Sequence, residues 1–119
     1  MANKRILTFD EILAARDLEE KEVYVAEWNG HVKIRSMTKA EQQAMRKEAS
    51  VNGQVDPDKL EIIMLAHCLI EPQVTIEQAE KLKDKSAAAV DKVLREILSI
   101  AGLTEEVQKE ALKSFRSRP

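Results

Sequence analysis

The sequence predicts an α+β domain, mostly α, in which a short N-terminal helix and a β-hairpin are followed by a bundle of about five helices. Three observations lead to this fold class. Helix-capping residues precede one helical pattern after another along the chain. Apolar and polar residues alternate on both sides of Asn29-Gly30, as they do in a hairpin. The 119 residues include only one Trp, one Tyr and two Phe, so the core must be mainly aliphatic, which suits helix packing.

Helix starts are marked by Ser, Thr or Asp residues, several of them with Glu or Gln three positions later, the spacing of a capping box. These capping residues are Thr8, Thr38, Asp56, Thr75 and Ser86. They predict helices over residues 9–16, 39–49, 57–70, 76–82 and 87–101, and a last helix that begins at 103–104. The helix over 57–70 is apolar nearly all round and is expected to be central, whereas the mostly polar helix over 39–49 is expected at the surface. The last helix would bury Val107, Ala111, Leu112 and Phe115.

The hairpin is predicted over residues 23–36. Asn-Gly favours a two-residue type I′ turn, and such a turn at Asn29-Gly30 places Val25 opposite Ile34. Alternation then predicts one buried face, made of Val23, Val25, Val32 and Ile34. The other face carries Tyr24, Trp28, His31, Lys33 and Arg35. On that face Tyr24 lies opposite Arg35, which predicts a cation–π contact between them.

Charge and cysteine content limit the classes of function. The 19 basic and 21 acidic residues give a net charge of −2, which offers no attraction to nucleic acid or to an anionic membrane. Cys68 is the only cysteine, the N-terminus lacks a signal peptide, and the longest apolar run, 62–66, is far too short to span a membrane. We therefore expect one domain over residues 1–119, with flexible ends at 1–6 and 116–119, in a reducing intracellular compartment.

No group of residues predicts catalysis, cofactor binding or metal binding. His67 and Cys68 are neighbours on one helix and point about 100° apart, so they cannot easily share a small site. Paired acids such as Glu105-Glu106 fall in the first turn of a helix, where they favour the positive end of the helix dipole. Neither a phosphate-binding glycine loop nor a dinucleotide fingerprint is present. The sequence therefore predicts a protein that is not an enzyme.

Six residues are candidates for binding a protein partner, because aromatic, Met and Arg side chains are frequent anchors of interfaces. They are Tyr24, Trp28, Arg35, Met45, Met64 and Phe115. For Trp28 an equally good alternative is that it covers the turn of the hairpin or packs on the first helix. Core burial explains most of the apolar helix over 57–70, although an exposed face on it would predict self-association. The basic C-terminal end is either a partner segment or simply an end.

The chain resembles the tail assembly chaperones of long-tailed phages and prophages, especially those of Gram-positive bacteria. The likeness begins with the front helix and the hairpin and continues through four segments: KIRSMTKAEQQAMRKEAS, KLEIIMLAHCLIEPQVT, VLREILSIAGLTEE and ALKSFRSRP. It covers nearly the whole chain and rests on the order of elements and on short runs of residues. It carries no catalytic signature.

The resemblance implies a non-enzymatic role without a cofactor. Such chaperones bind the tape measure protein, a long, helical and aggregation-prone chain, and help the tail tube protein polymerise around it. They act in the host cytoplasm and are not retained in the mature virion. Many are also made as a longer frameshifted product that recruits the tube protein, and this chain would be the short form. Two other classes stay open: a structural head–tail connector or completion subunit, and a small nucleic-acid-binding regulator, which the charge balance disfavours.

Overall fold

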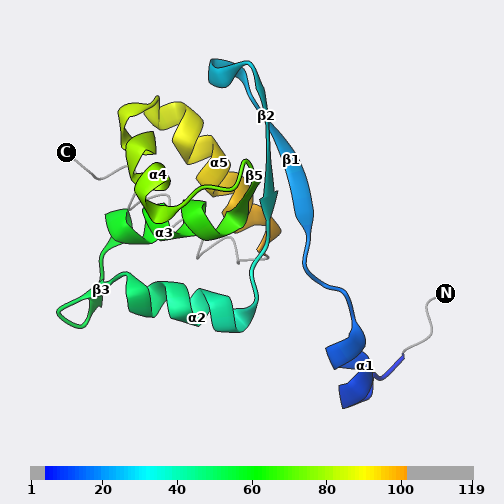
Figure 1. Cartoon of the computed structure of the whole chain (residues 1–119). Coiled ribbons are helices and arrows are strands. Elements are labelled where there is room, and N and C mark those ends of the chain that lie inside the picture. Colours follow the sequence, from blue (N-terminus) through cyan, green and yellow to red (C-terminus); the bar gives the residue numbers. More distant parts are fainter. Residues whose placement is uncertain (1–4, 102–119) are drawn as a thin grey trace.

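A computed structural model describes residues 5–101 of the chain (Figure 1). Its α-helices are α1 (Phe9–Ala14), α2 (Lys39–Glu48), α3 (Pro57–Cys68), α4 (Ile76–Lys81) and α5 (Ala87–Ile100). Its strands are β1 (Glu20–Val25), β2 (Gly30–Arg35), β3 (Ser50–Val51), β4 (Gln54–Val55) and β5 (Leu69–Glu71). Two short 3-10 helices are η1 (Ala26–Trp28) and η2 (Leu82–Asp84). The predictions for residues 1–4, for the last helix and for the C-terminal end lie outside the described residues.

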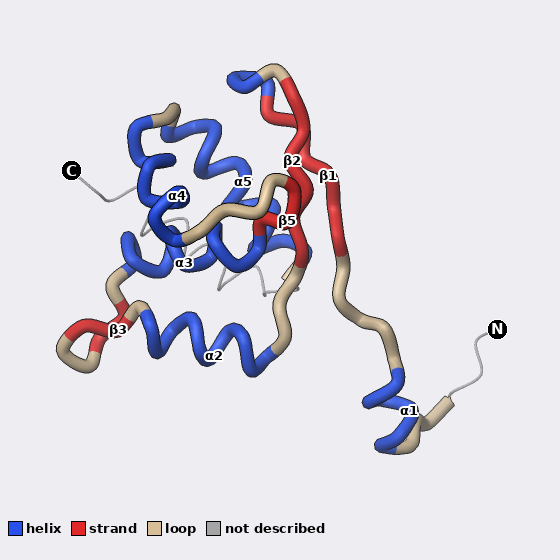
Figure 2. Tube along the Cα trace, viewed as in Figure 1, coloured by secondary structure: helices blue, strands red, loops and turns tan. Residues whose placement is uncertain are grey.

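A three-stranded antiparallel sheet and the four helices α2, α3, α4 and α5 make the body of the described chain. β2 is the central strand, with β1 on one side and β5 on the other. α5 packs against β1 and β2, whereas α3 packs against α2, α4 and β5. Figure 2 shows α1 standing apart from this body, at the end of a loop that leads to β1. The predicted class, α+β and mostly α, agrees with a helical content of 56% over residues 5–101, but the helices do not pack only on one another as those of a bundle would.

The predicted helix starts are confirmed by their caps. A capping box closes the first turn of α1, α2 and α4: the threonine hydroxyl accepts from the N–H three residues on, and the Glu or Gln there accepts from the threonine N–H. The threonines are Thr8, Thr38 and Thr75. Asp56 and Ser86 cap α3 and α5 in a simpler way. Each cap satisfies N–H groups that a helix start leaves unpaired, which stabilises the helix by about 1 kcal/mol.

The predicted two-residue turn at Asn29-Gly30 is wrong. η1 intervenes between the strands, only Asn29 has a positive φ there (50°), and Val25 pairs with Gly30 instead of lying opposite Ile34. The register therefore differs from the predicted one by four residues, the separation of Gly30 from Ile34. Because four is an even number, each side chain keeps its predicted face, and Val23, Val25 and Ile34 are buried as expected.

A type I′ turn occurs instead at the second Asn-Gly pair of the chain. Asn52 and Gly53 have φ values of 54° and 81°, and they join β3 to β4. Positive φ at both central residues is the requirement of a type I′ turn, and Asn and Gly tolerate it best. Asn-Gly therefore predicts a two-residue hairpin turn correctly at 52–53. At 29–30 the 3-10 helix η1 comes first, so Asn29 ends η1 and Gly30 already belongs to β2.

The end of α3 differs from the prediction and supplies the third strand of the sheet. α3 ends at Cys68 instead of continuing to residue 70, and the chain runs on as β5. Leu69 pairs with Ile34 and Glu71 with Lys33. A short apolar run before a proline is compatible with either helix or strand. Pairing with β2 decides between them, because the sheet gives backbone partners to residues that a longer helix would leave at its unpaired end.

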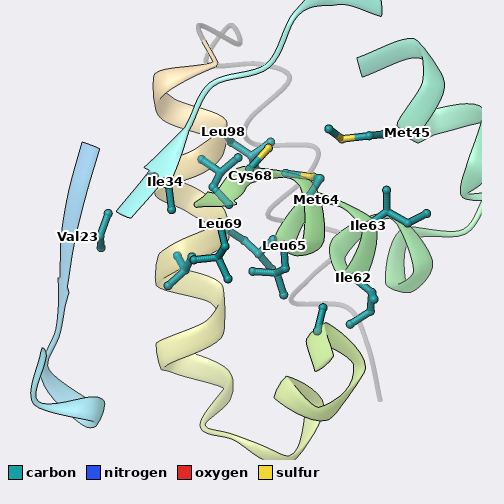
Figure 3. Packing of buried hydrophobic residues seen from close by; sticks show 14 of the residues in the cluster. Val23, Ile34, Met45, Ile62, Ile63, Met64, Leu65, Cys68, Leu69 and Leu98 are labelled. Carbon is teal, nitrogen blue, oxygen red and sulfur yellow. The ribbon is translucent and has the colours of Figure 1, made fainter. Parts of the chain in front are cut away.

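The core is aliphatic, as predicted, and lies between the sheet, α3 and α5 (Figure 3). α3 is the central helix and contributes Ile62, Ile63, Met64, Leu65 and Cys68. α5 contributes Ala89, Val93, Leu94, Ile97 and Leu98. The sheet adds Val23, Val25, Ile34 and Leu69. α2 buries only Met45 among its own residues, which confirms that it is a surface helix.

Candidate partner-binding surfaces

The N-terminal arm, residues 5–18, is an exposed apolar segment. Thr8 and Glu11 form the capping box that starts α1, and Glu11 also pairs with Arg5. No residue of α1 is buried in the body. Phe9 is 71% exposed and Leu13 68%. The arm is therefore held in shape by its own cap and charges, not by packing against the body of the described chain.

Most of the exposed apolar surface of the described residues belongs to this arm. Ten large apolar side chains are exposed between residues 5 and 101, and six of them lie on the arm: Ile6, Leu7, Phe9, Ile12, Leu13 and Leu18. The other four are spread over β1, β3, β4 and α4. Contiguous exposed apolar surface commonly marks an interaction site, and an isolated helix of six residues is too short to be stable in water without packing. The arm is thus the strongest candidate for a partner-binding surface.

The arm is not among the binding residues that the sequence predicts. Phe9, Ile12 and Leu13 are spaced i, i+3 and i+4, which places them on one face of a helix. That spacing is also typical of a helix that faces its own core. The available signal was the shortness of the helix combined with a stripe of large apolar residues. Only the fold shows that the described core residues do not pack against the apolar face of α1.

The base of the arm is fixed to the sheet. The Ser36 N–H donates to the Glu19 carbonyl oxygen and the Glu19 N–H donates to Ser36 Oγ, both at 2.8 Å. Ser36 is only 4% exposed. Beside this attachment is a hollow of about 340 Å³, to which Leu18, Met37 and Ala101 contribute. The last described residue of the chain therefore lies at the base of the arm, next to the point where the arm leaves the body.

On the hairpin, Tyr24 is exposed, whereas Trp28 is partly buried. Tyr24 pairs with His31 across the strands, and their ring centroids are 5.1 Å apart at an interplanar angle of 56°. Lys92 Nζ lies 6.0 Å from the centroid of the Tyr24 ring and donates to the Tyr24 carbonyl oxygen at 2.5 Å. Trp28 is half-buried and packs against the core. The predicted contact of Tyr24 with Arg35 is wrong, because the shifted register separates them.

Arg35 forms a two-point ion pair with Glu41 at the start of α2. Its Nη1 and Nη2 donate to Oε1 and Oε2 of Glu41 at 3.1 and 2.8 Å, and Nη1 also donates to the Ser36 carbonyl oxygen at 3.0 Å. The hydrogen bond from Arg35 lowers the pKa of Glu41 to about 2, and the same pair raises the pKa of Arg35. Arg35 therefore joins the sheet to α2, which is a structural role whether or not a partner also touches it.

Replacement of the Glu41 carboxylate should show this pair in the pH dependence of stability. Because the pKa of Glu41 is lower in the folded chain, its contribution is complete above its ordinary pKa of 4.5 and is lost as the pH falls toward about 2. Glu41→Gln keeps a capping acceptor for Thr38. We expect it to lower the free energy of unfolding by about 1–2 kcal/mol at neutral pH, after allowance for solvent screening of the partly exposed pair.

The measurement for Glu41→Gln is urea denaturation of both proteins at several pH values. The difference between them should shrink as the pH falls from 4.5 toward 2. A difference that stays constant over this range would contradict the ion pair. Glu27→Gln, an exposed change of the same kind on η1, is the matched control.

The remaining candidate residues are not on the surface of the described chain. Met45 is 2% exposed and Met64 5%, so both are core residues and are not available to a client in this conformation. Both belong to the buried apolar cluster, Met45 on α2 and Met64 on α3. Phe115 lies outside the described residues. Of the six candidates from the sequence, Tyr24 is exposed, whereas Trp28 and Arg35 are partly buried.

His67 and Cys68 are not a reactive pair. Cys68 is fully buried, and this burial raises the pKa of its thiol to about 11. The His67 side chain is exposed and its Nε2 lies 3.9 Å from Glu48 Oε2. A nucleophilic cysteine needs a lowered pKa, so the buried Cys68 thiol has the opposite property. Among residues 5–101, no three His, Cys, Asp or Glu side chains are placed to hold a metal ion.

A second hollow, of about 330 Å³, separates the start of α3 from η2 and the start of α5. Ile62, Leu65 and Val90 form part of its apolar wall, and Glu61 and Asp91 add carboxylates. Burial raises the pKa of Asp91. The hollow has mixed charge, because Lys83 of η2 and Lys85 of the following loop also line it.

Comparison with protein-family models, curated proteins and solved structures finds no match to this chain. None of the helices in the described part, residues 5–101, is long and apolar enough to cross a membrane.

Proposed function

We propose that the chain is a non-enzymatic phage tail assembly chaperone that binds the tape measure protein, keeps it in solution and promotes assembly of the tail tube around it. The proposal starts from the resemblance of four sequence segments to that family. It includes action in the host cytoplasm, absence from the mature virion, and recruitment of tube protein through a longer frameshifted product.

The observation that carries the proposal is the exposed apolar face of the arm. A client such as a tape measure protein offers long amphipathic helices, and a helical stripe of Phe9, Ile12 and Leu13 is complementary to such a helix. Aromatic and large aliphatic side chains at the centre of an interface supply most of its affinity. The charged body, with 34% Asp, Glu, Lys and Arg over the whole chain, would keep the complex in solution.

Charge on the arm adds a preference for the client. The arm carries Asp10, Glu11 and Asp17 against Arg5 and Arg16, a net charge of −1, and Glu11 is already paired with Arg5. Asp10, on the first turn of α1, is therefore the carboxylate that a Lys or Arg beside the apolar stripe of a client helix could meet. The exposed Tyr24 on the outer face of the hairpin is a second contact that the same client could reach.

Co-expression with the tape measure protein of the same phage tests the proposal. The paired change Phe9→Ser with Leu13→Ser should reduce the soluble client recovered with the tagged chain by about tenfold or more, because two central apolar contacts are lost. Val51→Ser with Val55→Ser is the matched control, since these two exposed valines lie on the separate β3–β4 hairpin. The control should recover the client as the unchanged protein does.

Two results would overturn the proposal. One is the failure of the unchanged chain to solubilise or retain any tape measure protein. The other is the presence of the chain in purified virions, measured by peptide mass mapping, because a structural connector or completion subunit stays in the particle and a chaperone does not. Equal recovery with the arm variant and its control would move the client site away from the arm.

A further inference from the structure

β1 is an edge strand of the three-stranded sheet. In the order β1-β2-β5, β2 pairs with one side of β1, and no strand within residues 5–101 pairs with the other side. Figure 2 shows β1 on the outer side of the molecule, above the loop that leads to α1. The open side of an edge strand presents N–H and C=O groups that can pair with a further strand.

The alternation of hydrogen bonds decides which residues of β1 face the open edge. In an antiparallel pair, every second residue bonds to the partner strand through both its N–H and its C=O. The Ser36 N–H donates to the Glu19 carbonyl oxygen, and this contact continues the register of β1 with β2, so the odd-numbered residues bond to β2. The Lys92 ammonium donates to the outward carbonyl oxygen of Tyr24, which agrees with this assignment. The residues that direct their backbone groups to the open edge are therefore Glu20, Glu22 and Tyr24.

Acidic side chains surround the first part of this open stretch. Glu20 and Glu22 are exposed, and Lys33 of β2 has its Nζ 3.3 Å from Glu20 Oε1. Glu20 raises the pKa of Lys33, mainly through this contact, and the charges of Glu71 and Glu22 raise it further. Three carboxylates against one ammonium give this part of the face a charge of −2.

The other end of the open stretch has a different character. Tyr24 is 46% exposed, and Lys92 already lies beside its ring and its carbonyl oxygen. Charge complementarity therefore calls for basic side chains opposite Glu20 and Glu22, and for an apolar side chain opposite Tyr24.

The same charges disfavour a second copy of this chain as the added strand. A copy that paired antiparallel along the whole open stretch would place Glu22 opposite Glu22 of the other copy, across a two-fold axis. Like charges directly opposite each other destabilise a strand pair, and charged side chains are a usual protection of an edge strand against its own kind. The edge is therefore better matched to a basic strand than to another β1.

We propose that the open edge of β1 binds an extended, basic segment of a partner protein as a fourth strand of the sheet. The segment carries Lys or Arg opposite Glu20 and Glu22 and an apolar residue beside Tyr24. Main-chain hydrogen bonds give such a contact its affinity, and the alternate side chains give it specificity. The edge takes an extended chain, whereas the arm presents a stripe to a helix, so this inference does not rest on the proposed function.

A synthetic peptide with two matched N-methylated forms tests the pairing on the purified full-length chain. The probe is acetyl-TITKTKT-amide, whose Ile and two Lys side chains share one face of a strand. Antiparallel addition sets these three opposite Tyr24, Glu22 and Glu20, with their N–H groups directed at β1. N-methylation of both Lys residues removes two of these donors. N-methylation of the two inner Thr residues keeps the charge and the number of methyl groups but removes only N–H groups that point away.

The form with N-methylated Lys should bind at least about tenfold more weakly than the form with N-methylated Thr, because two hydrogen bonds are lost. Titration of the isotope-labelled protein, followed by nuclear magnetic resonance, gives both dissociation constants.

Amide hydrogen exchange reports the same pairing from the side of the protein. In the free chain, exchange should be slow at Val23, which bonds to β2, and fast at Glu20, Glu22 and Tyr24. Peptide at ten times its Kd should slow exchange at these three residues by about tenfold. A contact made only by charged side chains would leave their backbone N–H groups open to water.

A charge reversal on the edge tests the chemistry of the segment. Glu22→Lys should weaken binding of the peptide by about five- to tenfold, because a like charge then lies opposite a peptide Lys. Glu77→Lys, which changes an exposed acid on α4 and gives the same net charge, is the matched control and should bind the peptide as the unchanged chain does. Circular dichroism checks that both variants are folded.

Four results would overturn the proposal. Equal affinity of the two N-methylated peptides would mean attraction by charge without a strand. Fast exchange at Glu20, Glu22 and Tyr24 with peptide bound would mean that it binds elsewhere. Absence of binding at about 1 mM peptide would mean that the edge does not accept a basic strand. A dimer with these amides protected before peptide is added would mean that a second copy occupies the edge. All four use the purified chain and a synthetic peptide, so they are separate from the co-expression test of the proposed function.

Discussion

Replacing Leu94 by alanine should lower the free energy of unfolding by about 3–4 kcal/mol. Leu94 is fully buried on α5, the helix that packs against β1, β2 and α3. Leu94→Ala removes its transfer free energy and leaves a cavity that three neighbouring elements can close only in part, and losses of about 3–5 kcal/mol are usual for such sites. A small domain is stabilised by about 5–15 kcal/mol in total, so the variant should be marginally stable.

Urea denaturation followed by circular dichroism measures the effect of Leu94→Ala. The midpoint should fall while the slope of the transition stays the same, because the area exposed on unfolding is nearly unchanged. Arg95→Ala, an exposed change on the next residue, is the control and should alter stability by less than about 0.5 kcal/mol. A loss below 1 kcal/mol for Leu94→Ala would mean that α5 does not close the core as described.

Replacing Met45 by alanine should lower the free energy of unfolding by about 2–3 kcal/mol. Met45 is the only residue of α2 that is buried, so it anchors this otherwise polar helix to the body. Met→Ala in a core costs about 2–5 kcal/mol, and the lower part of that range applies because a peripheral helix can shift to fill the space. The Arg35–Glu41 pair still holds the start of α2 in the variant.

The Met45→Ala result also decides the role of this residue. A client contact would lose binding without losing stability, whereas a core anchor loses stability first. Thermal unfolding and client recovery should therefore be measured on the same preparation at a temperature where the variant stays folded. Gln43→Ala, an exposed change on the same helix, is the control. If Met45→Ala left the stability unchanged but lowered the amount of client recovered, Met45 would be a client contact.

The local parts of the fold could be predicted from the sequence. Thr38 and Glu41 are three residues apart and form a capping box that depends on no other element, and the same holds for Thr75 with Gln78. The non-local parts could not. Whether Leu69 continues a helix or starts a strand is decided by Ile34, its partner on a strand far back in the sequence. Local pattern carries no information about that partner.

Of the candidate partner-binding surfaces, the sequence predicts the exposed Tyr24 but not the arm. Alternation correctly places Tyr24 on the outer face of the hairpin, because faces survive an even change of register. Composition, however, does not distinguish a methionine that meets a partner from one that anchors a helix, and the structure buries Met45. Phe9 and Leu13 look like an ordinary core stripe until the fold shows that no described core residue reaches them.

The attachment of α5 to β1 has a consequence for synthesis of the chain on the ribosome. Lys21 pairs with Glu96, and Tyr24 receives its hydrogen bond from Lys92, a residue 68 positions later. The hairpin can close as soon as residue 35 has emerged, but the helix that covers its apolar face is still unmade at that time. The apolar face of the hairpin is therefore exposed to solvent until α5 can pack on it. This face is made of Val23, Val25 and Ile34. Emergence of α5 from the ribosome, not closure of the hairpin, therefore sets the moment at which this apolar face can be covered.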